Sequence, residues 1–471
     1  MFTISGTRWI ALVVVCTGAV MMALNGALTV ALPTIKRDLV LSDDSLVWVV
    51  NSYTLAFGGF LLLSGRVGDM FGHRRTFLFG VSVIMLASLG CGLASSAPAL
   101  ICARALQGSG SAIVAASALP LLGALYTDNA KRTRALGIYG FVSISGGCVG
   151  MLLSGMITST LNWHWVFFIN LPAGILIHII GKTSLPDTHC APRTRLDFGG
   201  AVTVTGSLIL ALYAVTCVGT DNLAPHLRAV STLGAIALFL LFLAIEACVK
   251  APLLPLGLFR NRNVSVINIV GSLWAIALSA WIFISTLYLQ FVLQHPALQV
   301  SFDYLPADLV AAFISISVCA TVVLRCGVKF SLVSGLFVAA VGILLFARAP
   351  IAASGLFDVL PGMLLVGLGG GMVSSPLLIA ALESVPPQDV GLASGLIRTV
   401  SLMSGALGLG AVTRIASATT QKLLEYGADS SNALNDGYHV AFFASALSAA
   451  SAALVAAVLL RIEKKRPIIA M

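Results

Sequence analysis

Apolar runs of about twenty residues recur along the whole chain, separated by short breaks of Gly, Pro and charged residues. A segment of that length and composition crosses a lipid bilayer as one helix. Hydrophobic residues make up 58% of the chain and charged residues 10%, whereas a soluble domain carries roughly 25% charged residues. Because the excess is spread over the whole length, the sequence predicts an all-α integral membrane protein without a soluble domain.

Fourteen such runs are expected to span the membrane. Their approximate limits are 8–32, 46–64, 76–95, 98–125, 135–158, 163–181, 198–219, 229–249, 264–291, 304–324, 330–348, 356–382, 390–416 and 438–461. The first run is too long for the apolar core of a secretory signal, which has roughly 7–15 residues, and many similar runs follow it. We therefore interpret it as the first spanning helix.

The positive charges are distributed unevenly between the two sides that these runs define. With the N-terminus in the cytoplasm, nineteen of the 27 Lys and Arg residues fall at internal ends and loops. Five fall in external loops (Lys36, Arg37, Arg228, Arg348, Lys422) and three within helices (Arg104, Arg398, Arg414). Cytoplasmic loops are enriched in Lys and Arg. The bias favours an even helix count, with both termini on the cytoplasmic side of the cell membrane, and it explains the net charge of +9 without nucleic acid.

A weak internal repeat suggests how the helices are grouped. Gly327-Val328-Lys329 echoes Gly72-His73-Arg74, and the small-residue stretch 367–376 echoes 108–117. Both echoes fit two six-helix units with two helices inserted between them, and such repeats are a common transporter design. We expect an N-terminal six-helix bundle at 1–181, two linker spanning helices at 182–262, and a C-terminal six-helix bundle with a short basic tail at 263–471.

Several function classes lack a supporting motif. The nine cysteines lie mostly within apolar runs and, like the seven histidines, show no metal-ligand spacing. No nucleotide-binding G-x-x-x-x-G-K-[ST] loop is present, and no nucleophile–base arrangement appears. We therefore expect neither an enzyme nor a protein with a cofactor, a metal or catalytic residues.

Two motifs resemble one family of membrane proteins. The stretch "GRVGDMFGHRR" resembles the loop signature of the major facilitator superfamily, roughly G-x-L-x-D-R-x-G-R-[KR], and "ARALQGSGSA" resembles its R-x-x-Q-G-x-G-A motif. The matching residues are Gly65, Gly68, Asp69, Gly72, Arg74 and Arg75 in the first, and Arg104, Gln107, Gly108 and Gly110 in the second. The stretches 252–264 and 385–399 look like the fourteen-spanner drug:proton antiporter branch of that superfamily.

The resemblance implies a secondary exporter of small amphiphilic compounds such as drugs, antibiotics or secondary metabolites. It would work by alternating access, exchange its cargo for protons and act as a monomer in the lipid bilayer. In the resembled family, the stretch Gly65–Arg75 latches the two halves together on the cytoplasmic side. Two other functions remain open: an inward porter for a metabolite, and a non-transporting sensor or scaffold.

Charged residues near the apolar runs are the candidates for chemistry. Asp69 is an acid in a Gly-rich cytoplasmic turn, where it can pair with Arg74 or Arg75 or cap a helix N-terminus. Arg104 lies about two turns into its run with Gln107 on nearly the same face, so we expect both in a polar transport core. The alternative for Arg104 is a side chain that reaches the membrane interface.

A stripe of small residues marks the run 135–158. Gly146, Gly150 and Ser154 recur at every fourth position, a spacing that lets helix backbones approach closely. The resembled branch usually has G-P-x-x-G-G here, and this chain lacks that proline. We expect the close packing to remain.

The acid that the resembled branch carries in its first helix is missing. Leu24 stands at that position, next to Asn25, and leucine cannot bind a proton. Asp308 is the candidate substitute for proton coupling, although Pro306 and Asp308 also suit the first turn of a helix. Glu246 precedes Lys250 by four residues, which favours an ion pair.

Arg398 completes the candidate transport core. It shares a helix face with Gly391 and Gly395, which favours an inward position, and a side chain that reaches the cytoplasmic interface is the alternative. With Arg104 and Arg398 inside and no deep acid, we expect the cavity to favour neutral or anionic amphiphiles over lipophilic cations.

Overall fold

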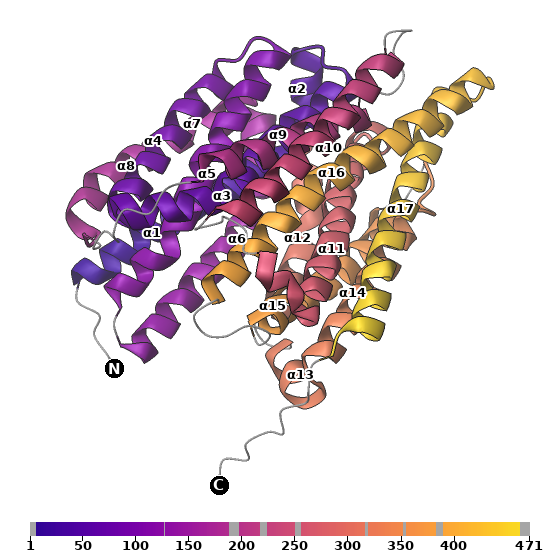
Figure 1. Cartoon of the computed structure of the whole chain (residues 1–471). Coiled ribbons are helices and arrows are strands. Elements are labelled where there is room, and N and C mark those ends of the chain that lie inside the picture. The colour runs from indigo at the N-terminus through magenta and orange to yellow at the C-terminus, as the bar shows by residue number, and fades with distance from the viewer. Residues whose placement is uncertain are drawn as a thin grey trace. The chain divides into compact units, whose positions relative to one another are not determined.

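The computed structural model describes residues 6–126, 128–187, 197–216, 224–249, 256–315, 319–351, 355–382 and 390–461. Every regular element in these ranges is a helix. The chain divides into two compact units, shown along the colour ramp of Figure 1. The first comprises residues 1–253 and 296–301, and the second comprises residues 254–295 and 302–471.

The N-terminal unit holds the elements up to α10. They are α1 (Gly6–Gly26), a 3₁₀ segment (Ala27–Ala31), α2 (Leu32–Asp38), α3 (Asp43–Phe71), α4 (His73–Gly92), α5 (Ala97–Leu125), α6 (Asn129–Thr160), α7 (His164–Phe168), α8 (Asn170–Ser184), α9 (Phe198–Thr216) and α10 (Ala224–Cys248). The two helices α9 and α10, expected as a separate linker, fall within this unit.

The C-terminal unit begins with a short 3₁₀ segment. Its elements are η2 (Leu256–Arg260), α11 (Arg262–Leu287), the π-helical turn η3 (Tyr288–Val292), α12 (Ala297–Phe313), α13 (Cys319–Cys326), α14 (Val328–Phe346), the π-helical turn η5 (Gly355–Val359), α15 (Leu360–Leu382), α16 (Val390–Glu425) and α17 (Ser430–Leu459). The first residues of α12 are grouped with the N-terminal unit.

Twelve helices among the described residues are long and apolar enough to cross a membrane. They coincide with twelve of the fourteen expected runs. The expected run 198–219 appears as a shorter apolar helix, Gly199–Val215, and the run 304–324 is divided between α12 and α13, with residues 316–318 outside the described part. The structure therefore supports an all-helical membrane protein without confirming the count of fourteen.

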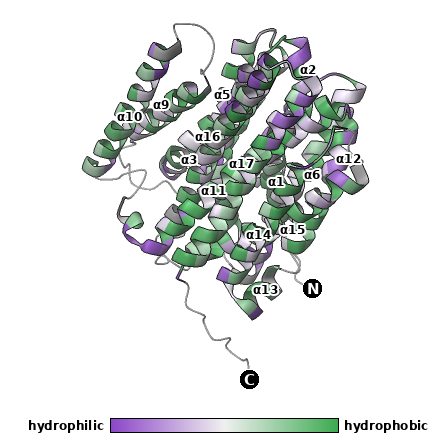
Figure 2. Cartoon of the chain, turned by 90° about the vertical axis from the view of Figure 1, so that its right-hand side faces the viewer, coloured by the Kyte–Doolittle hydropathy of each residue, from purple (hydrophilic) through white to green (hydrophobic). Residues whose placement is uncertain are grey.

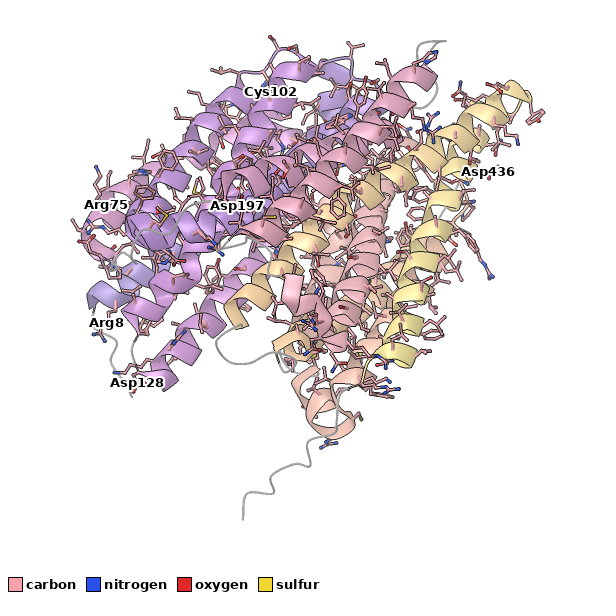
Figure 3. The ribbon with its side chains drawn as sticks, viewed as in Figure 1. Arg8, Arg75, Cys102, Asp128, Asp197 and Asp436 are labelled. Atoms are coloured by element: carbon pink, nitrogen blue, oxygen red, sulfur yellow. The ribbon has the colours of Figure 1, made fainter. Side chains whose placement is uncertain are left out.

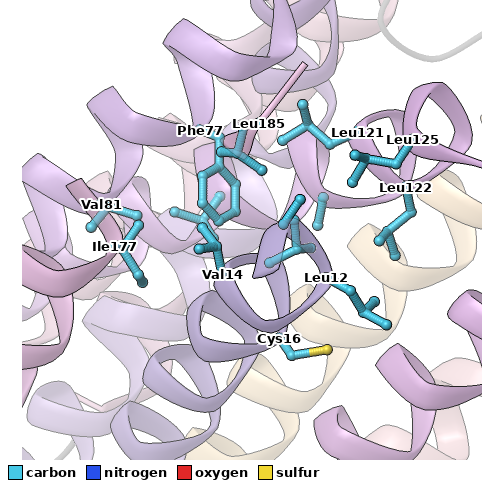
Figure 4. Packing of buried hydrophobic residues seen from close by; sticks show 14 of the residues in the cluster. Leu12, Val14, Cys16, Phe77, Val81, Leu121, Leu122, Leu125, Ile177 and Leu185 are labelled. Carbon is cyan, nitrogen blue, oxygen red and sulfur yellow. The ribbon is translucent and has the colours of Figure 1, made fainter. Parts of the chain in front are cut away.

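Apolar side chains cover both the inside and the outside of the helices. Buried residues of α1, α4, α5 and α8 form one cluster that includes Leu12, Phe77, Leu121 and Ile177 (Figure 4). Many leucines elsewhere are exposed, and Leu233, for example, is 66% exposed. Figure 2 shows hydrophobic colour along much of the long helices, such as α11 and α17. Exposed apolar faces of this extent fit a surface that contacts lipid.

The internal repeat is visible in the backbone geometry of each unit. Gly72 separates α3 from α4 with φ +88°, and Gly327 separates α13 from α14 with φ +92°. Both values lie in the region that favours glycine. A Cβ on Gly108 would lie 2.1 Å from the Tyr53 carbonyl oxygen, and one on Gly367 would lie 2.2 Å from the Ala307 carbonyl oxygen. Each unit thus has a glycine at which one helix packs directly against the backbone of another.

Substituting either of these contact glycines is expected to destabilise its unit. In Gly108→Ala and Gly367→Ala, the methyl group would overlap a backbone carbonyl of the neighbouring helix, which side-chain motion cannot relieve. We expect a lower midpoint of thermal unfolding in detergent for both variants. The matched control is Gly140→Ala on α6, which meets nothing within 4 Å and gains about 1 kcal/mol of helix propensity. Equal unfolding midpoints in all three variants would contradict the role of the contacts.

Candidate functional site

Arg104 lies inside the N-terminal unit, about 10 Å along α5 from Ala97 at 1.5 Å per residue. Its Nε donates to the Val49 carbonyl oxygen of α3 at 3.1 Å, and its Nη1 donates to Gln107 Oε1 at 2.7 Å. The guanidinium lies over the Tyr53 ring, 4.4 Å from the centroid, which is a cation–π geometry. Arg104 is 2% exposed, so its side chain does not reach the membrane interface.

The hydrogen bonds continue from Arg104 to two further helices. Gln107 Nε2 donates to Ser88 Oγ on α4 at 2.8 Å. The Tyr53 hydroxyl donates to Ser111 Oγ at 3.0 Å and lies 3.4 Å from the Met22 carbonyl oxygen of α1. The network therefore joins α1, α3, α4 and α5 around one buried cation.

This arrangement changes the role expected for Arg104 and Gln107. No carboxylate of the described residues lies within ion-pair distance of Arg104. Its charge is compensated by neutral acceptors and an aromatic face. Both side chains are closed off from solvent, so in this conformation they hold helices in place and do not line an open surface.

The stretch Gly65–Arg75 is helical except for a break of one residue, and is not the loop expected from its glycines. Helix α3 continues to Phe71 and α4 begins at His73, so Gly72 is the single residue between them. The loop prediction was wrong because Gly65 and Gly68 lie inside α3. Only Gly72 has the positive φ for which glycine is required.

Asp69 pairs with His73 and not with Arg74 or Arg75. His73 Nε2 lies 3.1 Å from Asp69 Oδ1 across the break. A Cβ on Gly68 would lie 2.5 Å from His73 Nδ1, so a glycine at this position leaves room for the imidazole ring. The histidine that departs from the family motif thus supplies the observed partner of the motif's acid.

Arg74 binds the last turn of α8 and the residues just after it. Its Nη1 donates to Asp187 Oδ1 at 2.9 Å, and its Nη2 donates to the Lys182 carbonyl oxygen. In the other unit, Lys329 Nζ donates to the Leu460 carbonyl oxygen after α17 at 2.9 Å. Each break therefore ties a basic residue to the end of the last helix of its own repeat.

Three labelled charged residues of the N-terminal unit lie toward one end of it. Figure 3 shows Arg8, Arg75 and Asp128 at one end and Cys102 at the other. Arg8 and Arg75 were both expected on the cytoplasmic side. Their common end agrees with the helix order deduced from the sequence, and Arg75 itself is exposed.

The small residues of α6 lie against α1 at one point. A Cβ on Gly146 would lie 3.0 Å from Ala23 Cβ, which marks a close approach of the two helices. Gly150 and Ser154 on the same stripe are buried.

The remaining candidates of the transport core are less defined. Asn25 lies near the end of α1, and its side chain is outside the described part of the structure. Leu24, at the position of the missing acid, is buried. Arg398 is exposed on α16, which agrees with either position expected for it.

Asp308 lies in the interior of α12 and not in its first turn. The helix begins at Ala297, so Asp308 is about 16 Å along its axis. The first-turn interpretation of Pro306 and Asp308 is therefore wrong. The start signal that the sequence analysis missed is Pro296, since proline is favoured at the beginning of a helix.

Two groups of titratable residues were not predicted as sites. His295 Nδ1 lies 2.8 Å from Asp303 Oδ2 in the C-terminal unit. Asp197 and Glu246 are both buried beside Gly200, where a Cβ would lie 2.5 Å from Asp197 Oδ2 and 2.9 Å from Glu246 Oε1. Lys250, the expected partner of Glu246, lies outside the described residues. Neither pair lies in one of the family motifs quoted above. The spacing of their members along the chain also gives no sign that they meet in the fold.

Comparison with known proteins places these features in a family. The sequence matches the profile of the Major Facilitator Superfamily over residues 13–409. It is 34% identical over 434 residues to the puromycin resistance protein pur8 of Streptomyces alboniger, covering 91% of this chain and 86% of that protein. It is 35% identical over 421 residues to the cephamycin export protein CmcT of Amycolatopsis lactamdurans, covering 88% and 86%.

Solved structures show the same fold. An auto-inhibited peptide transporter of the POT family superposes with a TM-score of 0.67 at 17% identity, covering 98% of both chains. The nucleoside transporter NupG superposes with a TM-score of 0.68 at 12% identity, covering 96% of this chain and 100% of that one. The family expected from the two motifs is confirmed: the chain is a multi-pass membrane transporter and belongs to the Major Facilitator Superfamily.

Proposed function

We propose that the chain exports small amphiphilic antibiotics or related secondary metabolites from the cell. The observation that carries this proposal is the likeness, at 34–35% identity over about nine-tenths of the chain, to a puromycin resistance protein and a cephamycin export protein. A third relative, 32% identical over 409 residues, is a lincomycin resistance protein of Streptomyces lincolnensis. We expect the cargo to be a compact molecule with both polar and apolar faces.

The proposed mechanism is alternating access driven by protons. Two six-helix bundles, 1–181 and 263–471, would rock around a central site, with the helices at 182–262 inserted between them to give fourteen spans. The repeated helix contacts at Gly108 and Gly367 support two equivalent bundles. We further propose that the break Gly65–Arg75 acts as the cytoplasmic latch between the bundles and that Asp308 is the coupling acid, because it lies inside α12.

We also propose the orientation and the assembly. Both termini face the cytoplasm, as the charge distribution of the loops favours, and the protein works as a monomer in the cell membrane. The cargo preference for neutral or anionic compounds now has less support, because Asp308 lies inside a helix and Arg104 is occupied by protein contacts.

Inside-out membrane vesicles provide the test. Vesicles that contain the full chain would be energised to an acidic interior, and puromycin, lincomycin, a cephamycin and ethidium would be added in turn. We expect at least one antibiotic to accumulate and to reduce the pH difference on addition. Vesicles without the protein are the control. Accumulation without any pH response would remove proton exchange, and loss of preloaded cargo in place of accumulation would show inward transport.

A further inference from the structure

His295 and Asp303 form a hydrogen-bonded pair between the end of α11 and α12. His295 Nδ1 and Asp303 Oδ2 are 2.8 Å apart, and the two side chains are 18% and 22% exposed. The pair is therefore shielded from solvent without being sealed. This combination is needed for a group that exchanges protons with the medium during each cycle.

The backbone around His295 is shaped to place the imidazole over α12. The π-helical turn η3 ends α11, and such turns occur frequently at functional sites. Gln294 then takes a left-handed conformation with φ 57°, which is uncommon for a residue other than glycine. The His295 amide donates to the Leu289 carbonyl oxygen at 2.9 Å. These features fix the backbone of His295 independently of its contact with Asp303.

Among the charged side chains around Asp303, His295 is the one that acts on its carboxyl group. The described titratable or charged side chains at this end of the unit include Tyr288 of η3, Tyr304 and Asp308 of α12, Arg348 after α14, Asp358 of η5, and Asp436, Tyr438 and His439 of α17. Tyr304 uses its hydroxyl for Ser285, Thr286 and the Ile282 carbonyl. His295 is the group whose charge and hydrogen bond act on the carboxylate of Asp303. The α6 segment 151–160, which packs against residues 297–301, carries no titratable side chain.

We propose that His295 and Asp303 form a proton-binding site at the external end of the C-terminal unit, through which protons reach Asp308. This inference rests on the exporter function and the orientation proposed above. Histidine is the side chain whose ordinary titration lies nearest neutral pH, so it suits exchange with an external medium. Asp303 precedes Asp308 on the same helix by about 7.5 Å of axial rise.

The proton balance of the site is simple. In the empty state, the Asp303 carboxylate and the imidazole share one hydrogen bond, and uptake of one proton gives a protonated pair in which the two groups share the added proton. Burial raises the pKa of Asp303, which lies outside the twelve candidate spans, whereas the hydrogen bond and charge of His295 lower it. Since burial is the larger effect, the carboxyl group is easier to protonate than an ordinary aspartate.

External pH dependence of export tests the proposal. Efflux of puromycin would be measured from intact cells that lack their own exporters, at external pH values between about 5.5 and 8.5, a range that includes ordinary histidine titration. We expect wild-type efflux to fall as the medium becomes alkaline. In His295→Asn, whose amide replaces the Nδ1 donor without titrating, and in Asp303→Asn, we expect efflux in acidic medium to drop at least about fivefold, by more than 0.9 kcal/mol, and the pH dependence to flatten.

A matched control lies at the same end of the unit. His439 Nδ1 lies 3.8 Å from Asp436 Oδ1, and its Nε2–H donates to the Ala349 carbonyl oxygen. The side-chain amide of His439→Gln can replace this hydrogen bond. We expect this variant to keep the wild-type pH profile. An unchanged profile in both His295→Asn and Asp303→Asn would overturn the proposal.

A second measurement does not depend on transport. Infrared difference spectra of the purified full chain between neutral and acidic pH should contain a carboxyl band that is absent from Asp303→Asn. We expect this band to titrate above the ordinary aspartate value of about 3.9, and at a still higher pH in His295→Asn. A band that titrates at or below the ordinary value would overturn the site. Failure of wild-type cells to export puromycin, with the band present, would count against the proposed function alone.

Discussion

Arg104→Met is expected to reduce export by a factor between about ten and a hundred. The substitution removes two hydrogen bonds from a charged donor, to Val49 and Gln107, and such bonds are worth about 1.5–3 kcal/mol each. It also breaks the link between α5 and α3 at the Val49 carbonyl oxygen, inside the buried network. We expect a lower unfolding midpoint together with the lower transport rate.

Arg104→Lys separates the charge from the geometry. Lysine keeps the positive charge near the Tyr53 ring but cannot reproduce the planar fork of guanidinium donors. We expect it to fold with nearly the wild-type unfolding midpoint and to export more slowly than wild type and faster than Arg104→Met. The measurement is initial efflux of puromycin, normalised to the amount of folded protein.

The matched control is another arginine inside a helix. Arg414 lies on α16 and is partly exposed, so Arg414→Met should stay within about twofold of wild type, a change of about 0.4 kcal/mol. Equal export by wild type and Arg104→Met would show that the buried network is not needed for transport. Equal losses in Arg104→Lys and Arg104→Met would show that the fork geometry matters and the charge does not.

Hydropathy was sufficient to predict most of the fold, because the bilayer imposes a minimum length on every spanning helix. Twelve expected runs coincide with helices of the required length and composition. The glycine echoes also predicted the repeat, because a glycine at a helix crossing or at a positive φ reflects a backbone requirement. Gly72 and Gly327, and Gly108 and Gly367, show that requirement in each unit.

Side-chain partners could not be predicted in the same way. Asp69 was expected to pair with Arg74 or Arg75, but the single-residue break at Gly72 places His73 over it. Arg104 was recognised as a buried cation, whereas the acceptor on Val49 is a main-chain carbonyl that no sequence pattern identifies. These partners depend on the register between helices, which hydropathy does not encode.

The position of Asp308 illustrates how one helix boundary decides a functional interpretation. With the helix expected to begin at residue 304, Asp308 suited an ordinary first turn. With the helix beginning at Ala297, the acid lies three turns inside, beyond the reach of the N-terminal amide groups that favour acids there. An ionised aspartate inside a membrane helix costs free energy, so a proton-binding role is the better interpretation of Asp308.

Asp308→Asn is expected to abolish accumulation against a gradient while leaving exchange of cargo intact. A pH difference of two units supplies about 2.7 kcal/mol per proton, enough for a cargo ratio of about one hundred at one proton per molecule. Without a titratable group at this position, the ratio should fall to about one. Exchange of labelled for unlabelled puromycin across the membrane needs no proton and should continue.

The final cargo ratio and the initial rate of export distinguish the role of Asp308 from that of the pair His295 and Asp303. Variants of His295 and Asp303 should slow export and flatten its dependence on external pH, yet approach the wild-type ratio with time. Asp308→Glu, which keeps the titratable group, should restore part of the ratio, and Asp436→Asn on α17, an exposed acid 3.8 Å from His439, should leave it unchanged. A full wild-type cargo ratio in Asp308→Asn would contradict the coupling role of Asp308. Because asparagine cannot bind the proton, another group would have to carry it.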